Sequence, residues 1–369
     1  MVSKETAMLA AAAAVLLGFS FVLSLASCAW ARRWPFAYFG EFVGVVRGRW
    51  IAVPQSGGFA FWLAALAVFS SAALVGVFGR AMLPGVIARY VDGVWYRSGE
   101  MGSILGLATL TLPAGYVIDI FELGWRPRLA FQILAATALA ACGTRVTLFW
   151  PFTHPVAGGL VTILWVVVLM NAFAFLDNLD GLAAGVGVIA SLLFAATQAQ
   201  VGSLFAPAAL VVVAGGLAGL FPYNRYPAKM SLGTGGSWLV GFLLGALTVA
   251  GTYYRYGVRE SRNSVLSPLL VMAVPLYESA AVLLFWLGER DQWFPGNPRF
   301  FSYRLGAVGL SPSQSVWLLL LVSLGAGLGA LLLRRLDAFG TVVLLGQTAC
   351  LIGVAAIIEI SAIRRKRVR

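Results

Sequence analysis

The stretch that decides the fold is residues 171–185, NAFAFLDNLDGLAAG. It continues an apolar run that begins near residue 163, sets Asp177 and Asp180 three positions apart, and returns to apolar sequence at Leu182. A carboxylate that faces lipid is costly, so we expect Asp177 and Asp180 to lie at the membrane interface or in a polar cleft. The structural alternative is that Asp180 caps a helix that starts at Gly181.

The composition predicts an all-α, polytopic membrane protein. The chain has 369 residues, of which 60% are hydrophobic and only 11% are charged, whereas soluble domains are about 25% charged. We expect one integral membrane domain over residues 1–369. About eleven apolar runs are long enough to cross a bilayer. They cover residues 6–29, 57–78, 101–120, 129–149, 156–176, 181–200, 203–222, 236–254, 265–288, 312–333 and 340–361.

Basic residues set the expected orientation. Lys and Arg are more frequent on the side that holds the short basic tail, residues 364–369, and cytoplasmic loops carry this excess. We therefore predict an inner-membrane protein with its N-terminus outside and its C-terminus in the cytoplasm. The net charge of +12 is spread over loops and the tail, which favours contact with anionic lipid head groups over nucleic-acid binding.

Cysteine and histidine offer no metal site. The three cysteines lie in or near apolar runs without CxxC spacing, which is typical of small hydrophobic residues and not of a disulfide framework or a zinc site. His154 is the only histidine and falls on the side opposite the central acids. A histidine-based metal site or proton relay is therefore excluded.

Further acids fall on the predicted cytoplasmic side. Asp119 and Glu122 end the run at 101–120, and Arg126 and Arg128 precede the next. These residues could form a surface ion pair, worth less than about 1 kcal/mol, or they could line a site. Because Asp119 shares its side with Asp177 and Asp180, the convergence favours a functional site.

Glycine-rich turns lie on the same side. Residues 233–237, GTGGS, precede a predicted helix, and a helix N-terminus with free N–H groups favours anions. The turn lacks the Gly-Lys-Ser/Thr ending of a P-loop. Gly57 and Gly58 follow Pro54 and suit close approach of the backbone to a ligand or, alternatively, simple helix packing.

Five segments together resemble the polyprenyl-phosphate N-acetylhexosamine-1-phosphate transferases. The central stretch resembles the family's NAxNxxDGxDGLAxG, VPQSGG resembles TPRxGG, and GYVIDIFELGWRPRLAFQ resembles a GxxDD run that ends in glutamine. NRYPAKMSLGTGGS resembles NxPPAKxFMGDxGS, and FFSYRLGAVGLSPSQ resembles HxHHRLxxxGLS. The matches keep the family's order, and ten or eleven helices is the family's architecture.

The resemblance implies a transferase reaction. Such enzymes move a sugar-1-phosphate from a UDP-sugar to a polyprenyl phosphate and release UMP, with Mg²⁺ as the cofactor that neutralises the diphosphate. The catalytic residues it implies are Asp119, Asp177 and Asp180. The substrate-binding residues it implies are Asn171, Asn224, Lys229, Arg128 and Arg304.

Several family positions hold other residues here. The first aspartate of the pair is Ile118, the asparagine used toward the metal is Ala174, and the metal-binding aspartate is Thr234. The three histidines fall on Phe300, Ser302 and Tyr303. Alanine cannot ligate Mg²⁺, and a neutral threonine is a weak substitute for a carboxylate. The metal ligands are therefore unknown from the sequence.

Two readings remain open, and they disagree on whether the chain is an enzyme. In the first, a divergent transferase regroups its three aspartates around the metal and uses a UDP-sugar. In the second, a catalytically inactive homologue binds polyprenyl phosphate or a glycolipid and serves as a membrane partner in cell-envelope assembly. The expected partners are the polyprenyl phosphate and a second copy or an envelope protein. A transporter is disfavoured because the sequence has no internal repeat.

Overall fold

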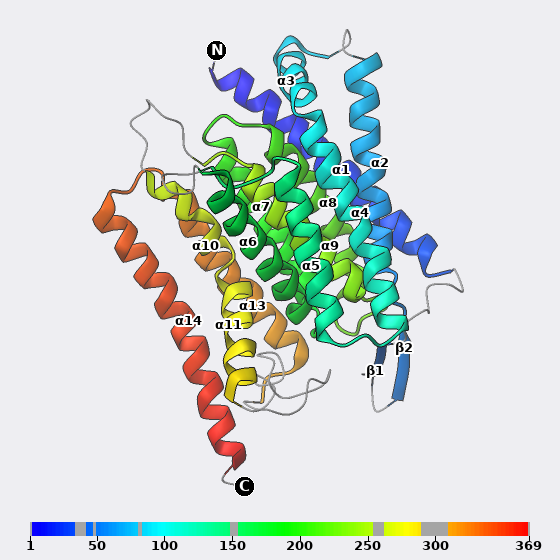
Figure 1. The fold of residues 1–369 in the computed structure, drawn as a ribbon, viewed down its shortest axis with the longest axis vertical. Coiled ribbons are helices and arrows are strands. Elements are labelled where there is room, and N and C mark those ends of the chain that lie inside the picture. Colours follow the sequence, from blue (N-terminus) through cyan, green and yellow to red (C-terminus); the bar gives the residue numbers. More distant parts are fainter. Residues whose placement is uncertain are drawn as a thin grey trace.

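The computed structural model describes residues 2–33, 42–46, 49–79, 83–147, 154–253, 262–288 and 309–367. Within these ranges the chain forms a bundle of long helices (Figure 1). The long helices are α1 (Val2–Ala31), α2 (Gly57–Phe78), α4 (Ser98–Ile120), α5 (Trp125–Ala141), α6 (Pro155–Leu176), α7 (Leu182–Ala199), α8 (Phe205–Asn224), α9 (Gly233–Ala250), α11 (Ala273–Gly288), α13 (Pro312–Leu328) and α14 (Ala338–Arg367).

Short elements complete the described chain. They are β1 (Phe42–Val46), β2 (Arg49–Val53), α3 (Gly85–Tyr96), η3 (Arg262–Leu266), α10 (Ser267–Val271) and η4 (Gly329–Leu331). The prediction of an all-α membrane fold is confirmed for the body of the molecule. The antiparallel hairpin β1–β2, which pairs Phe42 with Val53, is a local exception that the sequence did not predict.

The predicted count of eleven spans is not confirmed. Nine helices in the described ranges are long and apolar enough to cross a membrane, and a tenth span is formed if η3–α10 and α11 count as one bent unit. The remaining candidate is α5, which has only 17 residues. It ends at Ala141, before the predicted limit of 149, because Gly143 adopts a left-handed conformation (φ 99°) that terminates helices.

The predicted span at 265–288 is bent rather than straight. Its two parts meet at an angle of 61°, and the break lies at Met272, between α10 and α11. Pro275 has no N–H to donate to the carbonyl of Val271, so a continuous helix would lack that hydrogen bond. Proline at this position explains why the helix divides here.

Helices α7, α8 and α9 form the centre of the bundle. In their apolar windows 72–89% of the residues are buried, against 11% in those of α1 and α14. The outer surface of α14 is apolar, with Phe339 and Val342 exposed, as expected for a face that contacts lipid. Two serines fix α1 to α8, because Ser20 and Ser24 donate hydrogen bonds to the carbonyls of Val212 (2.7 Å) and Gly216 (2.6 Å).

Glycines allow the N-terminus of α9 to pack closely between α2 and α4. A Cβ atom on Gly58 of α2 would overlap Gly236, and one on Gly115 of α4 would overlap Gly235. The backbone N–H of Gly57 also donates to the carbonyl of Ser231 at 2.9 Å. Close backbone packing, the structural alternative for the Gly57–Gly58 pair, is thus what these glycines provide.

The ends of the bundle differ in content. In Figure 1, α1 begins at the upper end and α14 reaches the lower end, where the β1–β2 hairpin also lies. The α4–α5, α6–α7 and α8–α9 connections meet at one end. Ala228 of the α8–α9 loop donates to Asp180 of the α6–α7 turn, and Thr234 at the start of α9 donates to Asp119 at the end of α4. His154, the only histidine, caps α6 at its other end by accepting the N–H of Val156 at 3.3 Å.

Candidate active site

Asp119 stands in the last turn of α4 and contacts two other elements. Its Oδ1 accepts a hydrogen bond from the Thr234 hydroxyl at 2.9 Å and lies 3.6 Å from the guanidinium of Arg128. Arg128 is held in place because its Nε also donates to the carbonyl of Leu123 at 3.0 Å. The acid and the arginine of this connection therefore pair with each other, and they do so at the edge of the candidate site.

Asp177 and Asp180 lie in the turn that joins α6 to α7. Gly181 makes the turn possible through its left-handed conformation (φ 89°). The Oδ2 of Asp180 accepts the backbone N–H of Ala228, from the α8–α9 loop, at 3.0 Å. The alternative in which Asp180 caps the next helix is wrong, because Gly181 occupies the N-cap of α7 and has no side-chain cap.

Uncompensated negative charge distinguishes this turn. Burial raises the pKa of the Asp177 carboxyl well above its ordinary value, the carboxylates of Asp180 and Asp119 raise it further, and the backbone N–H of Gly233 opposes the shift. Burial also raises the pKa of Asp180, against the hydrogen bond from Ala228. A cation or a donor from a ligand would relieve this repulsion.

Two acids of the chain, Asp177 and Asp119, lie at the N-terminus of α9. The backbone N–H of Gly233 favours the charged form of Asp177, and the Thr234 hydroxyl donates to Asp119 at 2.9 Å. Helix N-termini favour negative charge. The glycine-rich turn predicted to hold an anion thus contacts two carboxylates of the protein, and its second and third glycines pack against α4 and α2.

Two amide side chains, those of Asn171 and Asn224, form hydrogen bonds that fix the elements carrying the site. Asn171 of α6 donates its Nδ2 to the Oε1 of Gln132 of α5 at 2.7 Å and to the carbonyl of Val167 at 2.8 Å. Asn224, at the end of α8, is buried and donates to the carbonyl of Met230 at 3.0 Å, while its Oδ1 has no hydrogen-bond partner among the described residues. Asn224 thereby fixes the loop that carries Ala228 and Lys229.

The other predicted residues are placed as follows. Lys229 is exposed on the α8–α9 loop, and its backbone N–H donates to the carbonyl of Tyr223 at 2.8 Å. Ala174 is partly buried one turn before Asp177. Arg304 lies outside the described residues, as do Phe300, Ser302 and Tyr303.

The described part of this site coincides with the region that matches known proteins. The family model for glycosyl transferase family 4 matches residues 101–252. The chain is 31% identical to the decaprenyl-phosphate N-acetylglucosaminephosphotransferase of Mycolicibacterium smegmatis, and the match covers 78% of this chain and 74% of that protein. This chain belongs to glycosyl transferase family 4.

Other relatives agree. The Mycobacterium leprae protein of the same name is 30% identical over 73% of this chain and 70% of its own length. The undecaprenyl-phosphate alpha-N-acetylglucosaminyl 1-phosphate transferase of Thermotoga maritima is 31% identical, over 37% of this chain and 40% of its own. The resemblance read from the motifs is therefore confirmed at the level of the family.

The acid set of this family 4 member does not form a cage for a metal. Among the described residues, no three His, Cys, Asp or Glu side chains lie close enough to share one ion. Mg²⁺ usually keeps several waters and takes one or two carboxylates together with substrate phosphates. The charged form of Asp177 is destabilised by two neighbouring acids. Asp177 fits that mode of binding, in which the diphosphate supplies the other oxygens.

Two residues of the site were missing from the predicted set. Gln132 is buried and pairs with Asn171, and its place at the end of the GYVIDIFELGWRPRLAFQ motif was the available signal. Thr234 was considered only as a lost metal ligand, yet its hydroxyl holds Asp119. Nothing in the sequence pairs residue 119 with residue 234, because only the fold brings α4 to α9.

Proposed function

We propose that this protein transfers a sugar-1-phosphate from a UDP-sugar to a polyprenyl phosphate, in the synthesis of a cell-envelope polysaccharide. The names of the relatives support the acceptor and the class of reaction. The observation that carries the proposal is the position of Asp177, whose charge is opposed by both Asp180 and Asp119. In the described part of the chain, three carboxylates from two connections have one ion-pair partner, Arg128, and such a set suits a substrate that arrives with a metal ion.

The reaction follows from the chemistry of the two phosphates. An oxygen of the polyprenyl phosphate attacks the β-phosphorus of the UDP-sugar, the bond from that phosphorus to the bridging oxygen breaks, and UMP leaves with the bonding electrons. Phosphoryl transfer depends mainly on positioning and on neutralising charge. Mg²⁺, when bound, supplies positive charge to the diphosphate.

The chain's own residues have separate roles in this proposal. Asp177 and Asp180 would hold the diphosphate with its metal ion, and Asp119 is held in place by Thr234 and Arg128. Lys229 extends from the loop that is fastened to Asp180 through Ala228, and we assign it to the incoming phosphate. Arg304 is assigned to the substrate on the resemblance alone.

A second function is favoured by one specific observation. Thr234 and Ala174 stand where the family's metal ligands are expected, and Thr234 already uses its hydroxyl to hold Asp119. A homologue that binds polyprenyl phosphate or a glycolipid without turnover would need no metal at this place. Such a protein would act on a partner, either a second copy or another protein of envelope assembly.

The proposal also fixes the orientation of the protein in the membrane. UDP-sugars are made in the cytoplasm, so we assign the end of the bundle with the acids to the cytoplasmic face of the inner membrane. The C-terminus, at the end of α14, then lies in the cytoplasm and the N-terminus outside, in agreement with the distribution of basic residues.

UMP release by the purified protein tests both functions. The substrates are UDP-N-acetylglucosamine and undecaprenyl phosphate, with and without Mg²⁺, for the wild type and the D177N/D180N double variant. The matched control is Asp337→Asn, an exposed acid that caps the start of α14, where asparagine is an equally good cap. Mg²⁺-dependent release that the double variant loses and the control keeps supports transfer. Retained lipid binding without any release, across several UDP-sugars, supports the second function.

A further inference from the structure

A stripe of α1 that faces α8 ends in an arginine. Ser20 and Ser24 of this stripe donate hydrogen bonds to carbonyls of α8. Cys28, one turn further, is fully buried, and Arg32 follows after another turn, since residues four apart lie on the same face of a helix. The backbone N–H of Arg32 donates to the carbonyl of Cys28 at 3.2 Å. The contact between the two helices therefore extends to a charged residue that continues the last turn of α1.

The partner of Arg32 on α8 is Tyr223. The guanidinium carbon of Arg32 lies 5.7 Å from the centroid of the Tyr223 ring, within the range of a cation–π contact. Arg32 and Arg33 are exposed, and neither forms an ion pair with another described residue. Trp30, on the last turn of α1, is 45% exposed. We call Trp30, Arg32, Arg33 and Tyr223 the α1–α8 site.

The α1–α8 site lies where two membrane spans end. The apolar span of α1 reaches Ala31, and that of α8 reaches Asn224. Arg32 and Tyr223 are therefore placed at the boundary between hydrocarbon and water. Tryptophan and tyrosine are enriched at this boundary, and arginine there attracts the head groups of anionic lipids. Two arginines that no described acid neutralises give the α1–α8 site the charge that such a head group requires.

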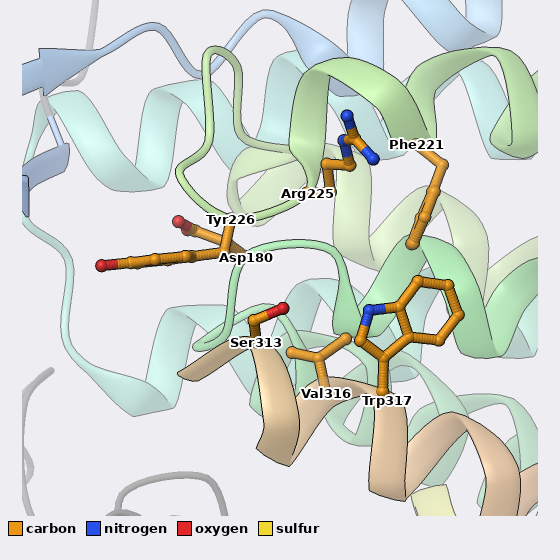
Figure 2. A pocket seen from close by; sticks show the side chains of 7 residues that line it. All are labelled: Asp180, Phe221, Arg225, Tyr226, Ser313, Val316 and Trp317. Atoms are coloured by element: carbon orange, nitrogen blue, oxygen red, sulfur yellow. The ribbon is translucent and has the colours of Figure 1, made fainter. Parts of the chain in front are cut away.

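The α1–α8 site and the acids lie on different faces of α8. The ring of Phe221 meets that of Trp317 edge to face, with centroids 6.3 Å apart, and Figure 2 shows both rings in one pocket with Asp180. Tyr223 follows Phe221 by two positions, which is about 200° around a helix of 3.6 residues per turn. A lipid phosphate bound by Arg32 is therefore separated from the acids by α8, and it is not the phosphate that reacts there.

The backbone of Tyr223 connects the α1–α8 site to the acids. Its carbonyl accepts the N–H of Lys229 at 2.8 Å and the N–H of Met230 at 3.1 Å. The residue before Lys229, Ala228, donates its N–H to Asp180 at 3.0 Å. A ligand that fixes the side chains around the Tyr223 ring therefore also restrains the loop that donates to Asp180.

We propose that the α1–α8 site binds the phosphate of an anionic phospholipid of the surrounding membrane, and that this lipid restrains the α8–α9 loop and so raises turnover. Arg32 and Arg33 donate to the phosphate, and the acyl chains lie along the exposed apolar face of α1, which includes Phe19 and Val22. The effect on turnover rests on the proposed function, whereas the binding of the lipid does not.

Binding is measured first. The Kd for phosphatidylglycerol is determined in detergent by native mass spectrometry for the wild type, Arg32→Gln and the Arg32→Gln/Arg33→Gln double variant. It should rise about fivefold for the first substitution and about fivefold again for the second, the factor expected for one arginine at an anionic lipid surface. The matched control is Arg335→Gln, an exposed arginine beyond the far end of α13, which should leave the Kd within about twofold of the wild type.

Lipid charge separates binding from a purely structural role of the arginines. In nanodiscs of phosphatidylcholine with an equal share of phosphatidylglycerol, the wild type and the control should have a higher Tm than in phosphatidylcholine alone, and Arg32→Gln should lose this increase. A Tm that Arg32→Gln lowers equally in both lipids, or an unchanged Kd for phosphatidylglycerol in the double variant, overturns the proposal.

Turnover then tests the connection through Tyr223. Phosphatidylglycerol should raise UMP release by at least about fivefold in the wild type, the lower end of common coupling between two sites, and should have no effect in Arg32→Gln. Tyr223→Leu, which removes the ring but neither arginine, should keep most of the binding and lose the stimulation, whereas Tyr223→Phe should keep both. Stimulation that persists in Tyr223→Leu overturns the connection.

Two further results have distinct meanings. If Arg32→Gln raises the KM for undecaprenyl phosphate equally with and without phosphatidylglycerol, the arginines serve the acceptor and the proposal is wrong. If no lipid mixture gives UMP release, the proposed function fails, and the Kd values for phosphatidylglycerol still decide whether the α1–α8 site binds an anionic phospholipid.

Discussion

The two ends of α4 carry acids in opposite electrostatic situations. At its beginning, Glu100 lies 2.7 Å from Arg97, and Arg97 also donates to the carbonyl of Ala250 at 3.0 Å and lies over the ring of Phe205, 4.0 Å from the centroid. At its end, Asp119 meets Arg128 only at 3.6 Å and lies close enough to Asp177 to raise its pKa. At the first end one acid is paired with one arginine, whereas at the second end three acids lie near one another and Arg128 is the arginine paired with them in the described part of the chain.

This difference separates structure from function. Arg97 fastens the start of α4 to the end of α9 and the beginning of α8, so its end of the molecule is held by paired groups. Acids that repel one another in a partly buried site persist in a folded protein when a ligand compensates for them. The comparison therefore predicts that substitutions at one end change stability and substitutions at the other change turnover.

The largest expected effect is on turnover. Asp119→Asn should lower the rate of UMP release by about 100-fold, since removing one preorganised charge from a site of this kind costs about that much. Glu100→Gln is the matched change at the other end of the same helix and should leave the rate within about threefold. Equal losses for the two variants in the same assay would remove the distinction between the ends.

The next effect is on stability. Arg97→Ala loses an ion pair, a hydrogen bond and a cation–π contact, and we expect its free energy of unfolding to fall by about 2 kcal/mol. Arg128→Ala loses a longer ion pair and the hydrogen bond to the carbonyl of Leu123, together worth about 1 kcal/mol. Thermal unfolding in detergent, with both variants at matched expression, measures the order, and a larger loss for Arg128→Ala contradicts it.

A smaller effect is expected from a gained carboxylate. Thr234→Asp sets a second acid against Asp119, at the place where the Thr234 hydroxyl now donates a hydrogen bond. The concentration of Mg²⁺ that gives half-maximal UMP release should fall by about tenfold, because two carboxylates bind a hard cation better than one. Thr234→Asn is the control of equal size, and a similar gain in that variant would show that charge is not the cause.

The sequence predicted the long helices and the side on which the acids lie, but not which residues pair with those acids. The runs of apolar residues predicted the long helices, and the acids of separate connections were expected on one side, where Asp119, Asp177 and Asp180 do lie together. The role of each acid stays a prediction. Pairing was beyond the sequence, because Thr234 and Asp119 are 115 positions apart and no local pattern links such residues.

The errors have local physical causes. The span at 129–149 was drawn too long because apolar residues continue beyond Gly143, whose left-handed conformation ends α5. The single helix at 265–288 ignored the missing N–H of Pro275. The β1–β2 hairpin lies between the predicted spans at 6–29 and 57–78, in a segment for which no strand was predicted.

The smallest effect is a dependence of stability on pH, and it isolates the charge of Asp177. Because the pKa of this carboxyl is raised in the folded protein, the folded state binds the proton more tightly than the unfolded chain. Stability contributed by the protonated form is therefore lost as the pH rises from the ordinary carboxyl value through the raised one. Asp177→Asn, which cannot ionise, should unfold at a Tm about 2 °C or more above the wild type at pH 8, with the difference shrinking toward pH 4. The same substitution should abolish the stabilisation of the wild type by Mg²⁺ with UDP-N-acetylglucosamine. A difference in Tm that does not change with pH would mean that packing, and not charge, sets the energy of this residue, and the contrast between the two ends of α4 would then rest on Asp119 alone.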